Sequence, residues 1–298
     1  MLELKQVLCA IDFSESSTRV VGYAAAFAGW YDANLTVLHV VVETDSEVIL
    51  GVPSHAQVAE DLRRSIALAG ANTPSADVSV REGHPVSVIL DEAVRTHADL
   101  LVLGTHGRSG FNRFLLGSVS EKLVRRISCP VLTVPPLATS APSEAVQLRR
   151  ILCPLDFSLS SMRALQYALS LAQESNGSLT VLHVIEWFPE EEPLVHAHFH
   201  VSEYRRRLMQ DARDRLHAQI PDDVRSWCNV DEVVAFSRAY REILSVAKTA
   251  EADLIVMGAQ GRGAVDSLLF GSTTEHVLRE APCPVLTLRA ESAVGSSA

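Results

Sequence analysis

The chain is a repeat of itself, and this feature constrains its fold more than any other. Val7–Val40 reads VLCAIDFSESSTRVVGYAAAFAGWYDANLTVLHV and Ile151–Val184 reads ILCPLDFSLSSMRALQYALSLAQESNGSLTVLHV, so half of the aligned positions are identical without a gap. A second match pairs Ala98–Val134 with Ala252–Leu288. The spacing between the copies rises from 144 to 154 residues, so the second copy holds ten extra residues, which we expect at Glu186–Ser202.

The 298 residues therefore divide into two related domains of ordinary size. The join between them, Pro135–Gln147, is rich in proline, alanine and serine and lacks apolar periodicity, as a linker does. We expect a first domain over residues 1–137, a linker over 138–148, a second domain over 149–290 and a tail over 291–298.

Each copy alternates short apolar runs with helix-like segments, and the runs are apolar throughout rather than at every second residue. The strands expected in the first copy are Gln6–Ile11, Leu35–Val42, Val78–Arg81, Leu100–Gly104 and Val131–Val134. Those expected in the second are Ile151–Leu155, Leu179–Ile185, Val230–Val234, Leu254–Gly258 and Val285–Leu288. Continuous apolar strands alternating with helices predict an α/β fold, in which a parallel sheet is covered by helices on both faces.

Helix signals stand between these strands. Ser14 is a candidate N-cap, Gln57–Ala69 is helical in pattern, Pro85 can open a helix that runs through His97, and Gly117–Ile127 forms the next helix. Sheets of this kind bind ligands at the carboxyl ends of their strands, near the switch in strand order.

A glycine pattern follows the fourth strand of each copy. It reads Gly104-x2-Gly107-x9-Gly117-Ser118 in the first copy and Gly258-x2-Gly261-x9-Gly271-Ser272 in the second. Glycines let a backbone approach a ligand closely, and the start of a helix favours an anion. Arg108 and Arg262 share one loop position and can neutralise phosphate charge. The pattern is neither a Walker A loop nor GxGxxG.

The glycine pattern also has an alternative interpretation that involves no ligand. Ser118-x-x-Glu121 and Ser272-x-x-Glu275 both fit a capping box, which needs no ligand. The glycines would then serve only to make a tight turn after the strand.

These motifs resemble the universal stress protein family over nearly the whole chain. The resemblance rests on the opening ILxxxDFSxxS at Val7–Ser17 and Ile151–Ser161, on the strand end LHV at Leu38–Val40 and Leu182–Val184, and on the glycine pattern. It implies two tandem Rossmann-like domains, each with a five-stranded parallel sheet covered by helices on both faces. The glycine pattern resembles that of the ATP-binding branch, which implies ATP with Mg²⁺ as counter-ion.

The resemblance also implies a nucleotide-binding role for individual residues at matching positions. In the first copy these are Ala10, Ile11, Asp12, Val40, Leu103, Gly104, Gly107, Arg108, Gly117, Ser118, Val119 and Ser120. In the second they are Pro154, Leu155, Asp156, Val184, Met257, Gly258, Gly261, Arg262, Gly271, Ser272, Thr273 and Thr274. The second copy departs from the pattern after its third strand, where Phe236–Tyr240 replaces the Glu82–Pro85 loop and its glycine.

The resemblance implies a nucleotide-dependent regulator of the stress response with little or no turnover, acting through an unknown protein partner. Two alternatives remain: an enzyme like the adenine-nucleotide hydrolases, and an interaction protein with empty nucleotide sites. The sequence shows no GxSxG or HExxH motif and no paired carboxylates at a recognisable spacing, so we expect no catalytic residues. His196, His198 and His200 lack an accompanying carboxylate or cysteine pattern, which favours a solvated loop over a metal site.

Charge, apolar runs and cysteines bear on partners and location. The net charge of −10 argues against nucleic acid as a partner. The apolar runs are too short to span a membrane, and Met1–Asp12 lacks the features of a signal peptide. The five cysteines form no CxxC pair and predict reduced thiols in a cytoplasmic protein.

The last strand of each copy predicts how the copies meet. Pro130–Val134 and Pro284–Leu288 have nearly the same sequence, and each would leave an unpaired sheet edge in an isolated domain. Tethering raises the effective concentration of one edge for the other. We therefore expect an intramolecular pseudo-dimer with these strands together and the linker around the outside. A further homodimer would use another surface.

Overall fold

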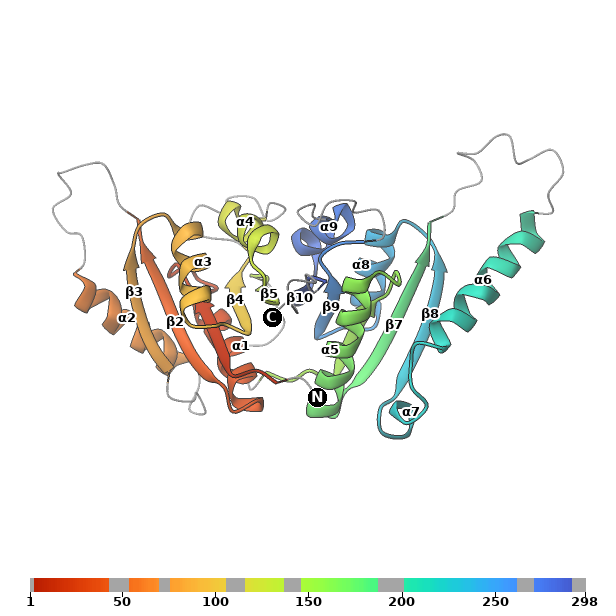
Figure 1. The fold of residues 1–298 in the computed structure, drawn as a ribbon, viewed down its shortest axis with the longest axis horizontal. Helices are drawn as coiled ribbons and strands as arrows, with labels where there is room; N and C mark the ends of the chain where they lie inside the picture. The colour runs from red at the N-terminus through yellow and green to blue at the C-terminus, as the bar shows by residue number, and fades with distance from the viewer. Residues whose placement is uncertain are drawn as a thin grey trace, which may run out of the picture.

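The computed structural model describes residues 3–42, 54–69, 76–105, 116–136, 146–186, 201–261 and 271–290 (Figure 1). The first copy contains β1 (Gln6–Ala10), α1 (Ser17–Trp30), β2 (Asn34–Val41), α2 (His55–Leu68), β3 (Ala76–Glu82), α3 (Pro85–Arg95), β4 (Leu100–Gly104), α4 (Ser118–Arg126) and β5 (Val131–Val134). The second contains β6 (Arg150–Pro154), α5 (Leu159–Ser175), β7 (Ser178–Ile185), α6 (Val201–His217), α7 (Val224–Trp227), β8 (Val230–Phe236), α8 (Ala239–Thr249), β9 (Leu254–Gly258), α9 (Ser272–Glu280) and β10 (Val285–Leu288).

All ten strands form one sheet, in the order β3-β2-β1-β4-β5-β10-β9-β6-β7-β8. The five strands of each copy are parallel, and β5 pairs with β10 in the antiparallel sense, with Leu132 opposite Leu286. Thr133 donates its hydroxyl to the carbonyl of Val285 at 3.2 Å, and Thr287 donates to that of Val131 at 3.3 Å. The predicted pairing of the last strands is confirmed. The path of the linker lies outside the described residues.

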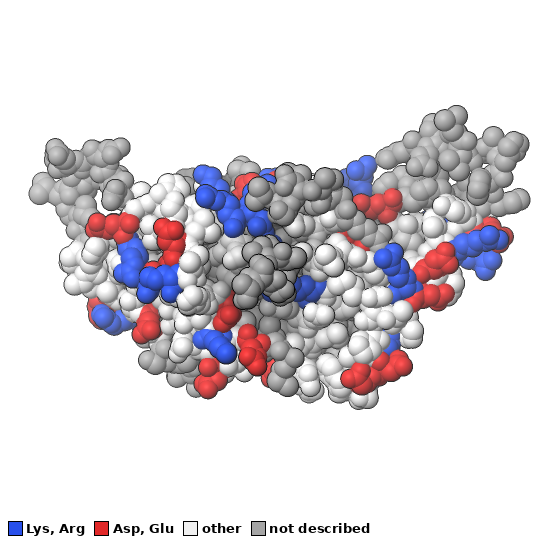
Figure 2. Space-filling model, in the orientation of Figure 1, with Lys and Arg blue, Asp and Glu red and all other residues white. Residues whose placement is uncertain are grey.

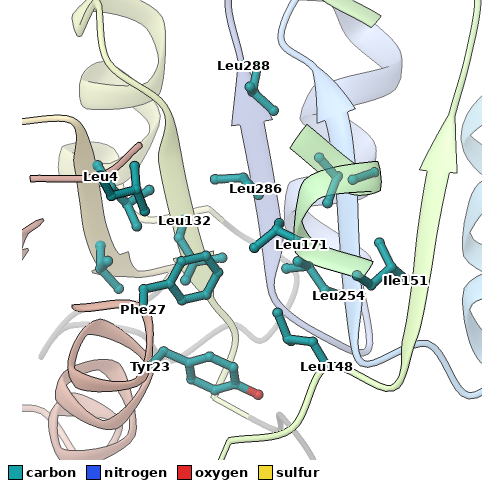
Figure 3. Close-up of a cluster of buried hydrophobic side chains, with 14 of the residues drawn as sticks. Leu4, Tyr23, Phe27, Leu132, Leu148, Ile151, Leu171, Leu254, Leu286 and Leu288 are labelled. Carbon is teal, nitrogen blue, oxygen red and sulfur yellow. The ribbon is translucent and has the colours of Figure 1, made fainter. Parts of the chain in front are cut away.

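The two copies share their hydrophobic core. Figure 3 shows Phe27 and Leu132 of the first copy close to Leu171 and Leu286 of the second, and all four side chains are almost fully buried. This layer holds α1, α2, α5 and α6 against one face of the sheet, and a second layer holds α3, α4, α8 and α9 against the other. The α/β prediction with helices on both faces is confirmed, and each copy completes the other's core at β5 and β10.

The predicted N-cap of the first helix, Ser14, is wrong. Helix α1 begins at Ser17 with Ser16 as its N-cap residue, because the chain makes one further turn there, in which the Ser17 N–H donates to the Ser14 carbonyl at 3.0 Å. In the second copy Ser158, the counterpart of Ser14, does cap α5 and accepts the N–H of Ser161 at 3.3 Å.

A buried carboxylate distinguishes the first copy. Glu92 of α3 is 3% exposed and accepts hydrogen bonds from Arg95 at 2.7 and 2.8 Å and from the Ser79 hydroxyl at 3.0 Å. Hydrogen bonding from Arg95, followed by that from Ser79 and the charge of Arg81, lowers the Glu92 pKa to about 2. The second copy has valine at both counterparts of Ser79 and Glu92, so it lacks this network.

The surface and the cysteines agree with an ordinary α/β protein. Figure 2 shows acidic and basic side chains interspersed over the described part of one face. None of the helices in the described ranges is long and apolar enough to cross a membrane. All five cysteines are free thiols, and burial raises the pKa of Cys129 and Cys283 to about 12.

Candidate functional site

Each copy has a cavity at the carboxyl ends of its central strands. In the first copy the chain runs outward from β1 to β2 and β3 on one side, and through β4 to β5 on the other, so the strand order switches between β1 and β4. The second copy repeats this arrangement between β6 and β9. Cavity 1, at β1 and β4, has a volume of about 810 Å³, and cavity 2, at β6 and β9, about 710 Å³. Both volumes are typical of small-molecule and cofactor sites.

The structure gathers the predicted site residues around these two cavities. Cavity 1 is lined by Ala10, Ile11, Asp12, Val40, Leu103, Gly104, Gly117, Ser118, Val119 and Ser120. Cavity 2 is lined by Pro154, Leu155, Asp156, Val184, Met257, Gly258, Gly261, Gly271, Ser272, Thr273 and Thr274. Gly107, Arg108 and Arg262 lie outside the described residues, as do His196, His198 and His200.

Helices α4 and α9 point their N-termini at the cavities. Gly117 and Gly271 occupy the N-cap positions, and neither helix has a side-chain cap. The capping-box reading of Ser118 and Ser272 is therefore wrong, because both serines are already the first helical residues. Helix N-termini without a side-chain cap leave backbone N–H groups for an anion, and the helix dipole adds to the attraction.

Two hydroxyl groups tie these helix starts to the strands behind them. Ser120 donates to the carbonyl of Gly104 at 2.7 Å, and Thr274 donates to that of Gly258 at 3.0 Å. The Gly117 N–H adds a bond of 2.7 Å to the carbonyl of Thr105. The hydroxyls of Ser120 and Thr274 thus fix the position of the helix N-terminus relative to the sheet.

Two glycines that line cavity 2, Gly258 and Gly271, differ in how much space surrounds them. A Cβ on Gly258 would lie 2.6 Å from the Ser160 hydroxyl and 2.9 Å from the Ser161 nitrogen, so close packing of α5 on β9 requires glycine. A Cβ on Gly271 would meet nothing nearer than 3.5 Å, and its φ of −68° suits any residue. Among the residues that the structure describes, none requires glycine at position 271, and a glycine there permits close approach of a ligand.

The two aspartates sit at the cavity edge, each held by its own turn. Asp12 accepts the N–H of Ser14 through Oδ1 at 3.0 Å. Asp156 accepts both the N–H and the hydroxyl of Ser158 through Oδ1, at 3.0 and 2.6 Å. The residue after Asp156, Phe157, has a left-handed φ of 63°, which completes the sharp turn from strand to helix.

Two histidines hold this edge of the sheet. His39 donates from Nδ1 to the carbonyl of Ile11 at 2.8 Å, and His183 donates to that of Leu155 at 2.7 Å. Each ring also contacts the phenylalanine that follows the aspartate, with ring centroids 4.5 and 4.7 Å apart. Both histidines therefore have hydrogen-bond partners within their own copy of the fold.

Sequence reasoning missed one wall of each cavity. Residues of α2, among them Asp61, Arg64 and Leu68, line cavity 1, whereas Glu186 and Ala239 line cavity 2. The sequence predicts the helix α2, but it does not predict which turn of that helix faces the cavity, because this depends on tertiary packing. The wall at Ala239 could have been predicted, because the sequence of the second copy departs from that of the first at Phe236–Tyr240, just after the third strand.

The sequence profile of the Universal stress protein family matches residues 3–135 and 147–289. The chain belongs to the universal stress protein family. It contains two family domains in tandem, as the repeat predicts. The two matched ranges coincide with the two halves of the sheet.

Several universal stress proteins resemble this chain along its length. It is 25% identical to a universal stress protein of Mycolicibacterium smegmatis and 27% identical to the universal stress protein MT2698 of Mycobacterium tuberculosis, in each case over 95% of this chain and 96% of the relative. It is 30% identical to Rv2005c of M. tuberculosis over 69% of this chain, and spans 66% of that protein. A crystal structure of a universal stress protein from Archaeoglobus fulgidus covers 97% of this chain, and this chain covers 98% of that structure, with a TM-score of 0.66 and 23% identity, which shows the shared fold.

Proposed function

We propose that each cavity of this universal stress protein binds ATP with Mg²⁺ as counter-ion, and that the protein is a nucleotide-dependent regulator of the stress response with little or no turnover. Some members of the family bind ATP. The observation that carries the proposal is Gly271, where the described residues leave room for a side chain but the sequence has none. Its counterpart Gly117 has the same place at the N-terminus of α4 and an ordinary φ of −57°.

The residues present fit a nucleotide in one orientation. The phosphates would meet the N-termini of α4 and α9 at Ser118 and Ser272, where backbone N–H groups can donate to them. The base would lie beside Val40 or Val184, at the ends of the neighbouring strands. Mg²⁺ is commonly held through substrate phosphates plus one or two carboxylates, so it needs no cage of protein ligands. Among the residues that the structure places, no three His, Cys, Asp or Glu side chains gather for a metal.

A regulator rather than an enzyme is favoured by what the cavity residues do. Phosphoryl transfer depends on orienting a nucleophile and stabilising charge. The Oδ1 atoms of Asp12 and Asp156 are engaged in their own turns, and the hydroxyls of Ser120 and Thr274 bind strand carbonyls. We expect hydrolysis far below the roughly 1–10³ per second of typical enzymes. A steady rate in that range, abolished by Asp12→Ala or Asp156→Ala, would favour the hydrolase alternative.

Titration calorimetry with MgATP tests binding and assigns it to the cavities. The wild-type chain should bind two nucleotides, and Gly117→Val or Gly271→Val should each remove one, because a branched side chain would occupy the place of the phosphate. Gly29→Val is the matched control, since a Cβ there meets nothing within 4 Å and the residue lies on α1 away from both cavities. Absence of ATP binding would favour the interaction protein with empty sites.

A further inference from the structure

The two cavities differ in chemistry at the end away from the helix N-termini. Most lining residues there correspond in conservative pairs, such as Ile89 with Ile243. Two pairs do not. The residue after β2 is Val42 whereas the residue after β7 is Glu186, and the first residue of α3 is Pro85 whereas that of α8 is Ala239.

A hydrogen bond connects these two exchanges. The Ala239 N–H donates to Oε1 of Glu186 at 2.7 Å, across 53 residues of sequence. Proline has no N–H, so Pro85 cannot orient an acceptor in this way. The Ala239 N–H holds the carboxylate at the wall of cavity 2, and among the described residues this is the one hydrogen bond that Glu186 makes.

Strand order places Glu186 at the base end of the site. Strand β6 lies between β7, which ends just before Glu186, and β9, which leads toward the N-terminus of α9. Neighbouring strands are about 4.8 Å apart, so the ends of β7 and β9 are separated by about 10 Å. A nucleotide whose phosphates lie at Ser272 therefore extends its base toward Glu186.

A carboxylate at the position of Glu186 can accept hydrogen bonds from N–H groups of the base. Ionised Glu186 only accepts, and its two oxygens can receive a pair of parallel N–H groups. Guanine presents such a pair at N1 and its 2-amino group, while the 6-amino group of adenine offers a single donor group. Val42 offers no acceptor at the corresponding position, and the carboxylate that does line cavity 1, Asp61 of α2, accepts a hydrogen bond from Arg64 at 3.2 Å. We propose that Glu186 is a specificity-determining residue, which lets cavity 2 bind guanine nucleotides as well as ATP while cavity 1 discriminates against them. This inference rests on the proposed function.

The alternative role for Glu186 is a cap for helix α8 and nothing more. Glu186→Gln separates the two roles, because the amide oxygen of glutamine still accepts the Ala239 N–H but its NH₂ group repels a second donor. Under the capping role alone, Glu186→Gln binds GTP as the wild type does, which would overturn the proposal.

Calorimetry with ATP and GTP tests the inference on one cavity at a time. Gly117→Val leaves cavity 2 for study, and Gly271→Val leaves cavity 1. Cavity 2 should bind GTP about tenfold or more tightly than cavity 1 does, and Glu186→Gln and Glu186→Val should each remove that difference with little change for ATP. The double variant Val42→Glu/Pro85→Ala should give GTP binding to cavity 1.

The outcomes separate this inference from the proposed function. Binding of ATP at both cavities with an equal ATP-to-GTP ratio would overturn the role of Glu186 and leave the proposed function standing. No binding of either nucleotide at either cavity would overturn both.

Discussion

Glu92 offers a quantitative test of the packing in the first copy. We consider Glu92→Gln, which keeps the shape of the side chain and removes its charge. The Glu92 pKa is lowered from 4.5 to about 2. A shift of this size corresponds to about 3 kcal/mol at most, and solvent screening of the exposed Arg95 and Arg81 reduces the expected loss to about 2 kcal/mol. Asp91→Asn, an exposed charge loss on the same helix, is the control.

The sign of the pH dependence follows from the direction of the shift. Because the pKa in the folded protein lies below that in the unfolded chain, the contribution of Glu92 is fully present above pH 4.5. It is lost as the pH falls from 4.5 to about 2. Urea denaturation followed by circular dichroism should show a destabilised variant at pH 7 and a smaller difference from wild type at pH 3. A loss equal to that of Asp91→Asn, or one independent of pH, would refute the reasoning.

Three further predictions concern packing and assembly. Gly258→Ala should lower the free energy of unfolding by about 1–3 kcal/mol, because its Cβ would overlap the Ser160 hydroxyl; thermal unfolding measures this, and an unchanged Tm would contradict it. Arg125→Ala should cost no more than about 1 kcal/mol, since its 3.3 Å ion pair with Glu275 is partly exposed, and the cost should shrink in 1 M salt. Separately expressed halves should form a one-to-one complex through β5 and β10 in gel filtration; halves that stay monomeric would argue against the shared core.

Most of the fold could be predicted because its strands are continuous apolar runs repeated twice. Leu100–Gly104 and Leu254–Gly258 are strands with the expected bounds. The antiparallel contact of Leu132 with Leu286 followed from two similar edge strands in one chain. Strand β3 is longer than expected, because an edge strand is partly exposed and its apolar pattern is weaker.

Details that depend on long-range contacts could not be predicted. Ser14 and Ser158 stand in the same motif, yet only Ser158 caps its helix. Glu186 and Ala239 are 53 residues apart in the sequence and are brought together where the paired strands β7 and β8 end, so no local pattern predicts that bond. The capping-box motif at Ser118 also gave a wrong prediction. The preceding residue, Gly117, takes the N-cap position of α4 at the cavity.

The central claim is that both cavities bind ATP with its phosphates at the N-termini of α4 and α9. The most direct test is a crystal structure of the full chain grown with ATP and Mg²⁺. The account predicts nucleotide in both cavities, with phosphate oxygens within hydrogen-bond distance of the backbone N–H groups of Ser118 and Ser272. Nucleotide bound elsewhere, or in these cavities with the phosphates turned away from both helices, would contradict it.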